Sequence, residues 1–384
     1  NKYYTAEQIN KKIRRAYGSR YYQSISYELE PVAKDTATII FTAEENPNTY
    51  VKAGLYYTRF RGINVNLNLT SRDFLLPNSR SMVSLSLGES IRLEAEHFQY
   101  LGRIKNIAFL TGFKLDNQTI DAYNDYKING AFKQNYYKAY LNFQNSGNNK
   151  LAAGIGTAFE YIRYRPSINA ISEVKGGFSN YKSYLYLKYN SLNQIFYPTR
   201  GLKINTELAQ VYNQKPNLTQ YNNGIPVTPS NLNFDNYSRF TFDGSLFSEI
   251  NKRITFFSEM QVGLNFTNNP NVLNNFLIGG INGSFRNQVR FAGLQEASIN
   301  SSSVSALQLG LRYNPANNVY ILGRINGLVK DFATTNNSTS GVTALTGYAL
   351  TFAYKTPIGP LELSAMYCDQ SKKLQSYVLF GIPF

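Results

Sequence analysis

The amino-acid sequence predicts an all-β chain whose strands close into a transmembrane barrel, and three observations lead to this prediction. From about residue 48 onward, apolar and polar positions alternate and no helical period is found. No stretch approaches the roughly 18 to 20 uninterrupted apolar residues of a membrane-spanning helix. Residues 374–384 alternate with few exceptions and end on Phe384, which is typical of the closing strand of a bacterial membrane barrel.

Residues 1–47 are predicted to hold one helix and two strands. Thr5 can cap the helix, and Gln8, three residues later, completes a capping box. An apolar stripe at helical spacing follows, and Gly18 is a natural stop. Two strands are expected at 21–30 and 36–43. This part therefore resembles a fragment of a small α/β module, in front of the barrel at 48–384.

Sixteen antiparallel strands are predicted for the barrel, and an even number returns the C-terminus to the side where the barrel begins. The predicted strands are 51–60, 63–72, 81–87, 91–100, 104–115, 132–143, 151–164, 181–189, 201–212, 237–250, 253–266, 303–313, 319–330, 342–354, 360–367 and 374–384. Residues 121–128 are assigned to a loop. Short and long connections mostly alternate from the fourth onward, and the longest, 267–302, is the sixth on its side. Short periplasmic turns and long extracellular loops are typical of outer-membrane barrels.

The two faces of the predicted strands differ in polarity in the way a membrane barrel requires. In 253–266, Phe256 and Met260 share one face, whereas Thr255 and Glu259 share the other. A soluble β-sandwich is the alternative for any single strand, but a sandwich has no reason to alternate short and long loops. An apolar exterior facing lipid and a polar interior explain both patterns.

Composition narrows the range of functions and partners. The single cysteine, Cys368, and the single histidine, His97, exclude a disulfide framework and a multi-cysteine or histidine metal site, so no metal or cofactor is expected. The net charge of +15 is spread along the chain, which favours anionic lipid head groups or an anionic passenger over nucleic acid. No signal peptide is visible, so we expect the chain to start after processing or part-way through a longer protein.

Three motifs suggest a family. They are Gly279-Gly280-Ile-Asn-Gly-Ser-Phe285-Arg286-Asn287 in the longest loop, Phe196-Tyr-Pro-Thr-Arg-Gly201 in a mid-barrel turn, and the Tyr-rich ends of the N-terminal helix. Together they resemble the superfamily of outer-membrane assembly factors and secretion transporters. In that family, periplasmic POTRA modules precede a sixteen-strand surface-antigen barrel. The resemblance implies a partial POTRA domain at 1–47 and the barrel at 48–384, in the bacterial outer membrane.

The resemblance also implies a site inside the barrel. In the family a glycine pair and an arginine hold the sixth extracellular loop in the lumen, a role that falls on Gly279, Gly280, Phe285 and Arg286 here. Asn287 and Gln288 depart from the family pattern, which usually has glycine and an aromatic residue at these places. A buried arginine needs a partner. The expected lumen partners are Glu259, Asn326 and Asp331.

The last strand is expected to close the barrel against 51–60 through a weak seam. Tyr377, Phe380, Gly381 and Phe384 are the residues assigned to this seam and to the signal for membrane assembly. Pro383 cannot donate a ladder hydrogen bond, and glycine weakens a strand locally.

The resulting hypothesis is a barrel for protein translocation or insertion across or into the outer membrane, with the sixth loop folded into its lumen. Its expected partners are outer-membrane lipid and lipopolysaccharide, an unfolded protein client or fused passenger domain, and accessory envelope subunits. The alternative is the membrane anchor of a patatin-like phospholipase whose lipase domain lies upstream of residue 1, because 51–88 looks most like that barrel. A diffusion porin, the third possibility, needs neither a POTRA module nor the loop motif. The sequence has no Gly-x-Ser-x-Gly elbow, so this chain is not expected to be an enzyme.

Overall fold

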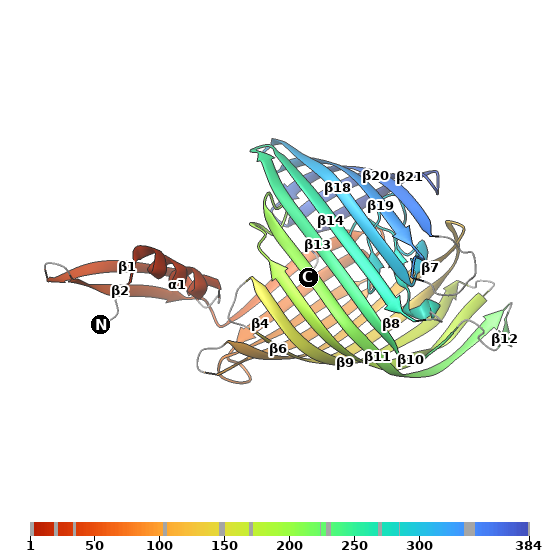
Figure 1. Cartoon of the computed structure of the whole chain (residues 1–384), viewed down its shortest axis with the longest axis horizontal. Coiled ribbons are helices and arrows are strands. Elements are labelled where there is room, and N and C mark those ends of the chain that lie inside the picture. The colour runs from red at the N-terminus through yellow and green to blue at the C-terminus, as the bar shows by residue number, and fades with distance from the viewer. Residues whose placement is uncertain are drawn as a thin grey trace.

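The computed structural model of the chain describes residues 4–18, 22–33, 36–102, 106–145, 150–168, 172–222, 224–227, 232–267, 271–283, 285–333 and 342–382. Within these ranges no helix has the length and apolar character needed to cross a membrane. The N-terminal part is a helix beside a two-stranded sheet, and the remainder is a closed barrel (Figure 1).

The N-terminal elements are α1 (Ala6–Gly18), β1 (Tyr22–Ala33) and β2 (Thr36–Glu45). The backbone N–H of Gln8 donates to Oγ1 of Thr5 at 3.3 Å, and the N–H of Thr5 donates to Oε1 of Gln8 at 3.2 Å. These two bonds are the predicted capping box. β1 and β2 pair antiparallel from Tyr22–Glu45 to Ala33–Thr36. We call the end of the barrel beside these elements the hairpin end, and the opposite end the far end.

Among the described residues, sixteen long strands form the closed antiparallel barrel, which confirms the predicted fold class. In chain order they are β3 (Thr49–Thr58), β4 (Gly62–Arg72), β5 (Ser79–Gly88), β6 (Ile91–Leu101), β7 (Ile107–Asn124), β8 (Lys127–Asn145), β9 (Leu151–Ile168), β10 (Ser172–Asn190), β11 (Gly201–Asn222), β13 (Tyr237–Asn251), β14 (Ile254–Phe266), β18 (Ser303–Ala316), β19 (Val319–Lys330), β20 (Thr343–Thr356), β21 (Gly359–Cys368) and β22 (Lys373–Gly381). The short β12 (Ile225–Val227) pairs with the end of β11.

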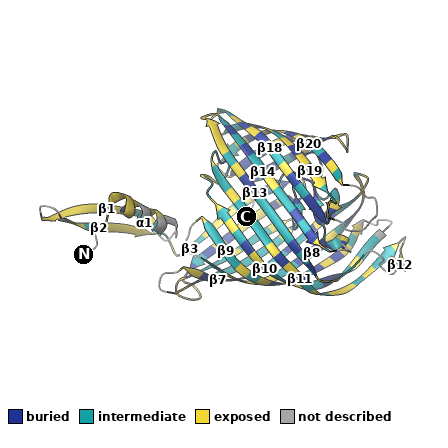
Figure 2. Cartoon of the chain, viewed as in Figure 1, coloured by how far each residue is buried: buried dark blue, intermediate teal, exposed yellow. Residues whose placement is uncertain are grey.

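The barrel wall has the inverted polarity that the sequence predicts. On β4, Asn64 and Asn66 are buried inside, whereas the intervening Ile63 and Val65 are 62% and 45% exposed. Figure 2 shows the same alternation of exposed and buried positions along most strands. Apolar side chains on the outside would be unfavourable in water, and lipid removes that cost.

The wall is much taller on one side than on the other. β3 to β6 have 10 or 11 residues, close to the roughly 9 to 11 that cross a bilayer, whereas β7 to β11 have 18 to 22. β6 pairs with β7 only as far as Ile91–Asn117, so the rest of β7 extends beyond its neighbour at the far end. Figure 1 shows these long strands reaching away from the hairpin end.

The expectation of a loop at 121–128 is wrong. β7 and β8 continue as a ladder to Asn124–Lys127, and the turn lies at Asp125 and Tyr126, which both have positive φ. The 165–180 and 213–236 loops are likewise shortened by extensions of β9, β10 and β11. Beyond the hydrocarbon core of the bilayer neither face meets acyl chains, so the apolar alternation that marks the other strands weakens there.

Candidate functional site

The described part of the sixth loop, 271–283 and 285–302, folds into the barrel and forms a small sheet of its own. It contains a 3-10 turn, η1 (Val272–Asn274), and three short strands, β15 (Phe276–Ile278), β16 (Gln288–Val289) and β17 (Ile299–Ser301), in the order β16-β15-β17. Its apolar side chains pack against the inner wall in one buried cluster with β18, β19, β20 and β21: Phe276, Ile278, Val289, Phe291, Leu294, Val304, Ala306, Leu328, Leu345 and Cys368. The loop is therefore a packed plug with its own hydrophobic core.

The glycine pair lies where the loop turns back on itself. Gly279 and Gly280 have φ values of +128° and +79°. A side chain on Gly279 would overlap the carbonyl oxygen of Gln295, and one on Gly280 would approach Cγ of Glu296 to 2.7 Å. Nε2 of Gln288 donates to the carbonyl oxygen of Gly279 at 2.7 Å, which ties β16 to this turn. Glycine is required here by conformation and by space.

Arg286 forms the deepest charged contact of the loop. Its Nη1 lies 3.6 Å from Oε2 of Glu160 on β9, and its guanidinium lies 5.2 Å from the ring centre of Tyr136 on β8. Oη of Tyr136 donates to Oε1 of Glu160 at 2.9 Å, and Nζ of Lys182 lies 3.7 Å from the same oxygen. Glu160 is 5% exposed, so this cluster is withdrawn from water. Charged groups in such surroundings are held by their partners.

The carboxylate beside Arg286 is not one of the expected partners. Glu259 faces Arg290 of the same loop, at 3.5 Å, and Asp331 accepts a hydrogen bond from Oγ of Ser301 at 2.7 Å. The expected partners Glu259 and Asp331 lie on β14 and at the end of β19, strands that are close to the loop in sequence. The loop instead crosses the lumen to β9, which is four strands from β14 around the ring.

Further contacts tie the loop to three more parts of the wall. Arg290 pairs with Asp243 on β13 at 3.2 Å, and its backbone N–H donates to Oε1 of Gln261 at 2.7 Å. Burial alone would lower the pKa of Arg290, but the carboxylates of Glu259 and Asp243 outweigh it and raise that pKa. Nδ2 of Asn326 donates to the carbonyl oxygen of Ala292 at 2.9 Å, so this residue does face the loop.

Phe285 makes an aromatic contact at the far end of the short strands. Its ring centre lies 5.2 Å from that of Phe60, in the β3–β4 turn. That turn is itself fixed by Arg61, whose two Nη atoms each donate to the carboxylate of Asp116 on β7 at 3.0 Å. The loop motif thus contacts the first strand pair of the barrel as well as β8 and β9.

The seam between β3 and β22 is short in the described residues. It consists of three residue pairs, Leu379–Thr58, Phe380–Tyr57 and Gly381–Tyr56. Its neighbours, in contrast, run the length of their strands: β3–β4 extends from Thr49–Ser71 to Thr58–Gly62.

Of the four predicted seam residues, Phe380 and Gly381 pair with β3, Tyr377 points into the barrel, and Phe384 is not described. Gly381 has a φ of +90°, and a side chain there would overlap the carbonyl oxygen of Leu55 on β3. Tyr377 is 2% exposed and lies in the interior, in a buried cluster with Ile281 and Ala292 of the sixth loop. The seam strand and the plug therefore pack directly against each other. Phe384 lies outside the described residues.

A second connection crosses the hairpin end of the barrel. The β10–β11 turn carries Tyr197, whose ring stacks on Tyr320 of β19 at 4.2 Å and whose Oη donates to Oε1 of Glu362 on β21 at 2.9 Å. Arg312 on β18 donates to the carbonyl oxygen of Pro198 at 2.6 Å. The turn singled out in the sequence therefore joins two distant parts of the wall.

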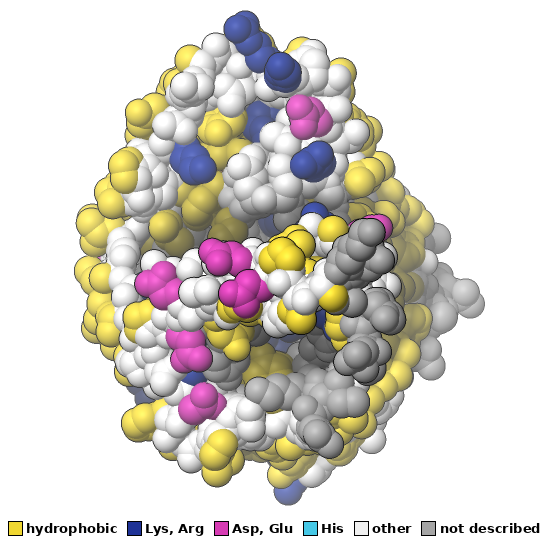
Figure 3. All heavy atoms as spheres, turned by 90° about the vertical axis from the view of Figure 1, so that its left-hand side faces the viewer, with side chains coloured by type: hydrophobic (Ala, Val, Ile, Leu, Met, Phe, Trp, Pro, Cys, Tyr) yellow, Lys and Arg dark blue, Asp and Glu magenta, His cyan; other side chains and the backbone are white. Residues whose placement is uncertain are grey.

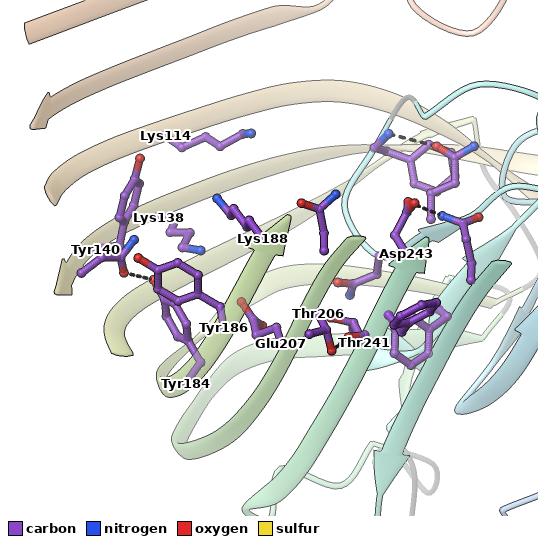
Figure 4. Close-up of a pocket in the computed structure, with 18 of the residues that line it drawn as sticks. Lys114, Lys138, Tyr140, Tyr184, Tyr186, Lys188, Thr206, Glu207, Thr241 and Asp243 are labelled. Carbon is purple, nitrogen blue, oxygen red and sulfur yellow. Dashed lines mark hydrogen bonds between the residues drawn. The ribbon is translucent and has the colours of Figure 1, made fainter. Parts of the chain in front are cut away.

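A cavity remains between the plug and the wall. A cavity of about 460 Å³ lies between the loop and the wall from β6 to β14 and is lined by charged and phenolic side chains. Figure 4 shows Lys114, Lys138 and Lys188 on one part of this lining, and Glu207 and Asp243 on another. A second cavity of about 280 Å³ adjoins Arg286 and Glu160. Among the described residues no group of three metal-ligating side chains occurs.

Sequence reasoning missed the residues that face the loop from the opposite wall, above all Glu160 and Tyr136. Both lie at inward positions of predicted strands, and an isolated inward carboxylate was the available signal. Choosing among several inward carboxylates needs the ring order and stagger of the strands, which the pattern of alternation does not contain.

Comparison with known proteins agrees with this geometry. The family model described as the OMP85 superfamily matches residues 37–384, and no curated protein matches the chain. The structure is similar to that of BamA from Haemophilus ducreyi lacking POTRA domains 1–3, with a TM-score of 0.64 and 14% identity over 98% of this chain and 78% of that chain. It is also similar to CdiB from Escherichia coli, with a TM-score of 0.58 and 11% identity over 94% and 69% of the two chains. For CdiB from Acinetobacter baumannii the values are 0.53 and 12% over 98% and 68%. Because the family model covers nearly the whole chain, this protein belongs to the OMP85 superfamily and is a β-barrel of the bacterial outer membrane.

Proposed function

We propose that this barrel inserts or translocates proteins into or across the outer membrane. The seam between β3 and β22 is the part of the wall that opens, and the sixth loop is the plug that moves with it. The observation that carries the proposal is the contact between the two: Tyr377 and Leu379 of β22 share one buried cluster with Ile281 and Ala292 of the loop. Displacing either element exposes apolar surface on the other, so their movements are coupled.

The seam is suited to reversible opening because its backbone ladder is short. Three ladder pairs join β3 to β22 in the described residues, and each backbone hydrogen bond contributes about 1 kcal/mol net. The lipid-facing side of this ladder is aromatic, with Tyr57 opposite Phe380. An opening seam would present strand edges to a client, which can pair with them by strand addition.

The N-terminal part is proposed to be a partial POTRA domain, at 1–47, that lies in the periplasm and receives the client. Among the described residues, β1 and β2 pair with each other and leave their outer edges for strand addition. The β1–β2 hairpin carries four exposed acidic residues, Glu28, Glu30, Glu44 and Glu45. Figure 3 views the molecule from the hairpin end, and several acidic side chains lie near the middle of that face. An extended client with basic residues would be attracted here.

The test is a disulfide that locks the seam. In a Cys368→Ala background, Tyr57→Cys and Phe380→Cys place two thiols on directly opposed residues, a spacing that suits a disulfide. The matched control is Leu363→Cys with Val378→Cys, an opposed pair one strand away between β21 and β22. The probe is a urea-unfolded eight-strand outer-membrane barrel added to proteoliposomes, with its folding followed by heat-modifiable migration.

The proposal predicts that the seam lock slows insertion of the probe, that a reductant restores it, and that the control lock has no effect. Equal insertion by the two locked variants would contradict it. A second candidate, the anchor of a patatin-like lipase, rests only on the resemblance of 51–88, and a lipase sequence in the reading frame upstream of residue 1 would favour it.

A further inference from the structure

We propose that the outer wall of the tall side of the barrel binds a phosphorylated lipid of the outer leaflet, lipopolysaccharide. The phosphates would be held by a basic patch on β8 to β11 and one acyl chain by a groove below it. The basic patch consists of Lys133, Arg163, Arg165, Lys175 and Lys215, all exposed. The inference is independent of the translocation proposal and requires only that the far end faces outward, as long extensions do in outer-membrane barrels.

The basic side chains point away from the lumen, because the residues between them point into it. On β9, Ile162 and Tyr164 are 0% and 5% exposed and pack inside with Tyr136 and Phe178. Since side chains alternate along a strand, Arg163 and Arg165 lie on the outer face. Lys133 lies opposite Arg165 in the ladder and shares that face.

Lys175 and Lys215 also lie on the outer face of the barrel. On β10, Phe178 is fully buried in the interior, so Gly177 and Lys175 lie outside. Gly177 is opposite Arg163, and Ser179 is opposite Lys215. The patch therefore spans four adjacent strands, a width of roughly 14 Å at about 4.8 Å per strand.

The basic side chains of the patch lie on the outer face of the β8–β11 extensions alone. On the inner face of the same extensions the side chains are apolar or neutral: Gln118, Ile120, Phe132, Gln134, Tyr164, Phe178 and Leu218. Within the described residues none of the five basic side chains lies within 4.0 Å of a carboxylate. Glu173, two residues before Lys175 on β10, shares this outer face by the same alternation. The cations thus gather on the face that turns toward the membrane.

A row of tyrosines lies directly below the basic patch on the same outer face. Tyr137 is opposite Tyr161, with ring centres 6.0 Å apart, and Tyr181 stacks on Tyr212 at 6.1 Å. Tyrosine is typical of the membrane interface, where its ring meets apolar groups and its hydroxyl meets water. The basic patch begins one outward position beyond this row, at Arg163, which is the level of lipid head groups.

Below the tyrosines an apolar groove of about 640 Å³ runs across β7 to β13. Its apolar lining is Phe109, Leu141, Phe143, Ile155, Leu185 and Leu208. The outward residues nearest the tyrosines are polar and adjacent in the ladders, Thr157, Ser183, Gln210 and Ser238, and Oγ of Ser238 donates to Oε1 of Gln210 at 2.6 Å. An acyl chain in the groove would bring its ester and hydroxyl groups to this polar row and its phosphate to the basic patch. From the far end toward the membrane centre, the outer surface is therefore basic, then polar, then apolar, which is the order of the phosphate, the ester and hydroxyl groups, and the acyl chain of one lipid.

The experiment measures binding of purified lipid A to the full chain in detergent. Arg163→Gln with Arg165→Gln removes two charges from the basic patch, and Lys252→Gln with Arg253→Gln removes two exposed charges from the β13–β14 turn at the hairpin end. We expect the first variant to bind about 30-fold more weakly, corresponding to about 2 kcal/mol for two basic side chains, and the control to bind like the wild type. Heat-modifiable migration verifies that both variants are folded.

Further binding measurements identify which part of the lipid is recognised. Lipid A with its phosphates removed should bind the wild type as weakly as intact lipid A binds the patch variant, and inorganic phosphate should not displace lipid A. Thr157→Phe fills the upper end of the groove and should weaken binding while leaving the basic patch intact. Equal affinities of the patch and control variants, or displacement by inorganic phosphate, would overturn the proposal, and an unchanged affinity of Thr157→Phe would remove the groove from it.

Discussion

Replacing Glu160 by Gln leaves the guanidinium of Arg286 inside the barrel without the carboxylate 3.6 Å away. Removing one partner of a buried ion pair costs about 3 to 5 kcal/mol. We expect the lower end of this range, because Lys182 retains Glu207 at 3.0 Å and Arg286 retains the ring of Tyr136. About 3 kcal/mol raises the equilibrium constant for release of the loop roughly 150-fold.

The opposite replacement, Arg286→Met, should cost less. Glu160 then keeps Lys182 at 3.7 Å and the hydroxyl of Tyr136 at 2.9 Å, so only one charge-assisted contact is lost, about 2 kcal/mol. The double variant leaves neither charge of the pair buried without its partner and should lose less than Glu160→Gln alone. The pair is therefore expected to be strongly non-additive.

Release of the loop can be followed by a thiol buried at its centre. Ala292 is 0% exposed, so Ala292→Cys in a Cys368→Ala background reacts with a membrane-impermeant maleimide only when the loop leaves the lumen. Arg253→Met, in an exposed turn, is the control and should leave the labelling rate unchanged. Unchanged labelling of the Glu160→Gln variant, or additive effects in the double variant, would refute the assigned role of the ion pair.

Three further predictions concern other parts of the same structure. Gly381→Ala should destabilise the barrel by about 1 to 3 kcal/mol, measured by urea unfolding, because the side chain overlaps Leu55 and φ is positive; unchanged stability would mean that the seam has a different geometry. Tyr197→Phe removes the hydroxyl bonded to buried Glu362 and should raise channel conductance, with a cost of about 1 to 3 kcal/mol; an unaltered conductance would separate this turn from the pore. Burial raises the pKa of Glu296 in the sixth loop, so ionisation opposes docking of the loop as the pH rises through that raised pKa. Glu296→Gln should therefore slow labelling of the buried thiol at neutral pH and flatten its pH profile, whereas an identical profile would exclude Glu296 as the group responsible.

The barrel could be predicted because lipid imposes a pattern of alternating polarity on most strands that cross it. Asn64 and Asn66 inside, with Ile63 and Val65 outside, are readable without any knowledge of neighbouring strands. The extensions at 118–124 and 127–131 could not be predicted, because outside the bilayer that pattern disappears. The motif of the sixth loop singles out Arg286 as a candidate anchor, but its partner Glu160 depends on the path of the loop across the lumen.

The most direct measurement of the central claim is hydrogen–deuterium exchange of the backbone amides of the barrel in lipid nanodiscs. Peptides from β3 and β22 should exchange a large part of their amides quickly, since three ladder pairs join these strands in the described residues. Peptides from β20 should stay protected, because β20 is paired along its length with β19 and β21. Protection of β3 and β22 equal to that of β20 would contradict a seam that opens.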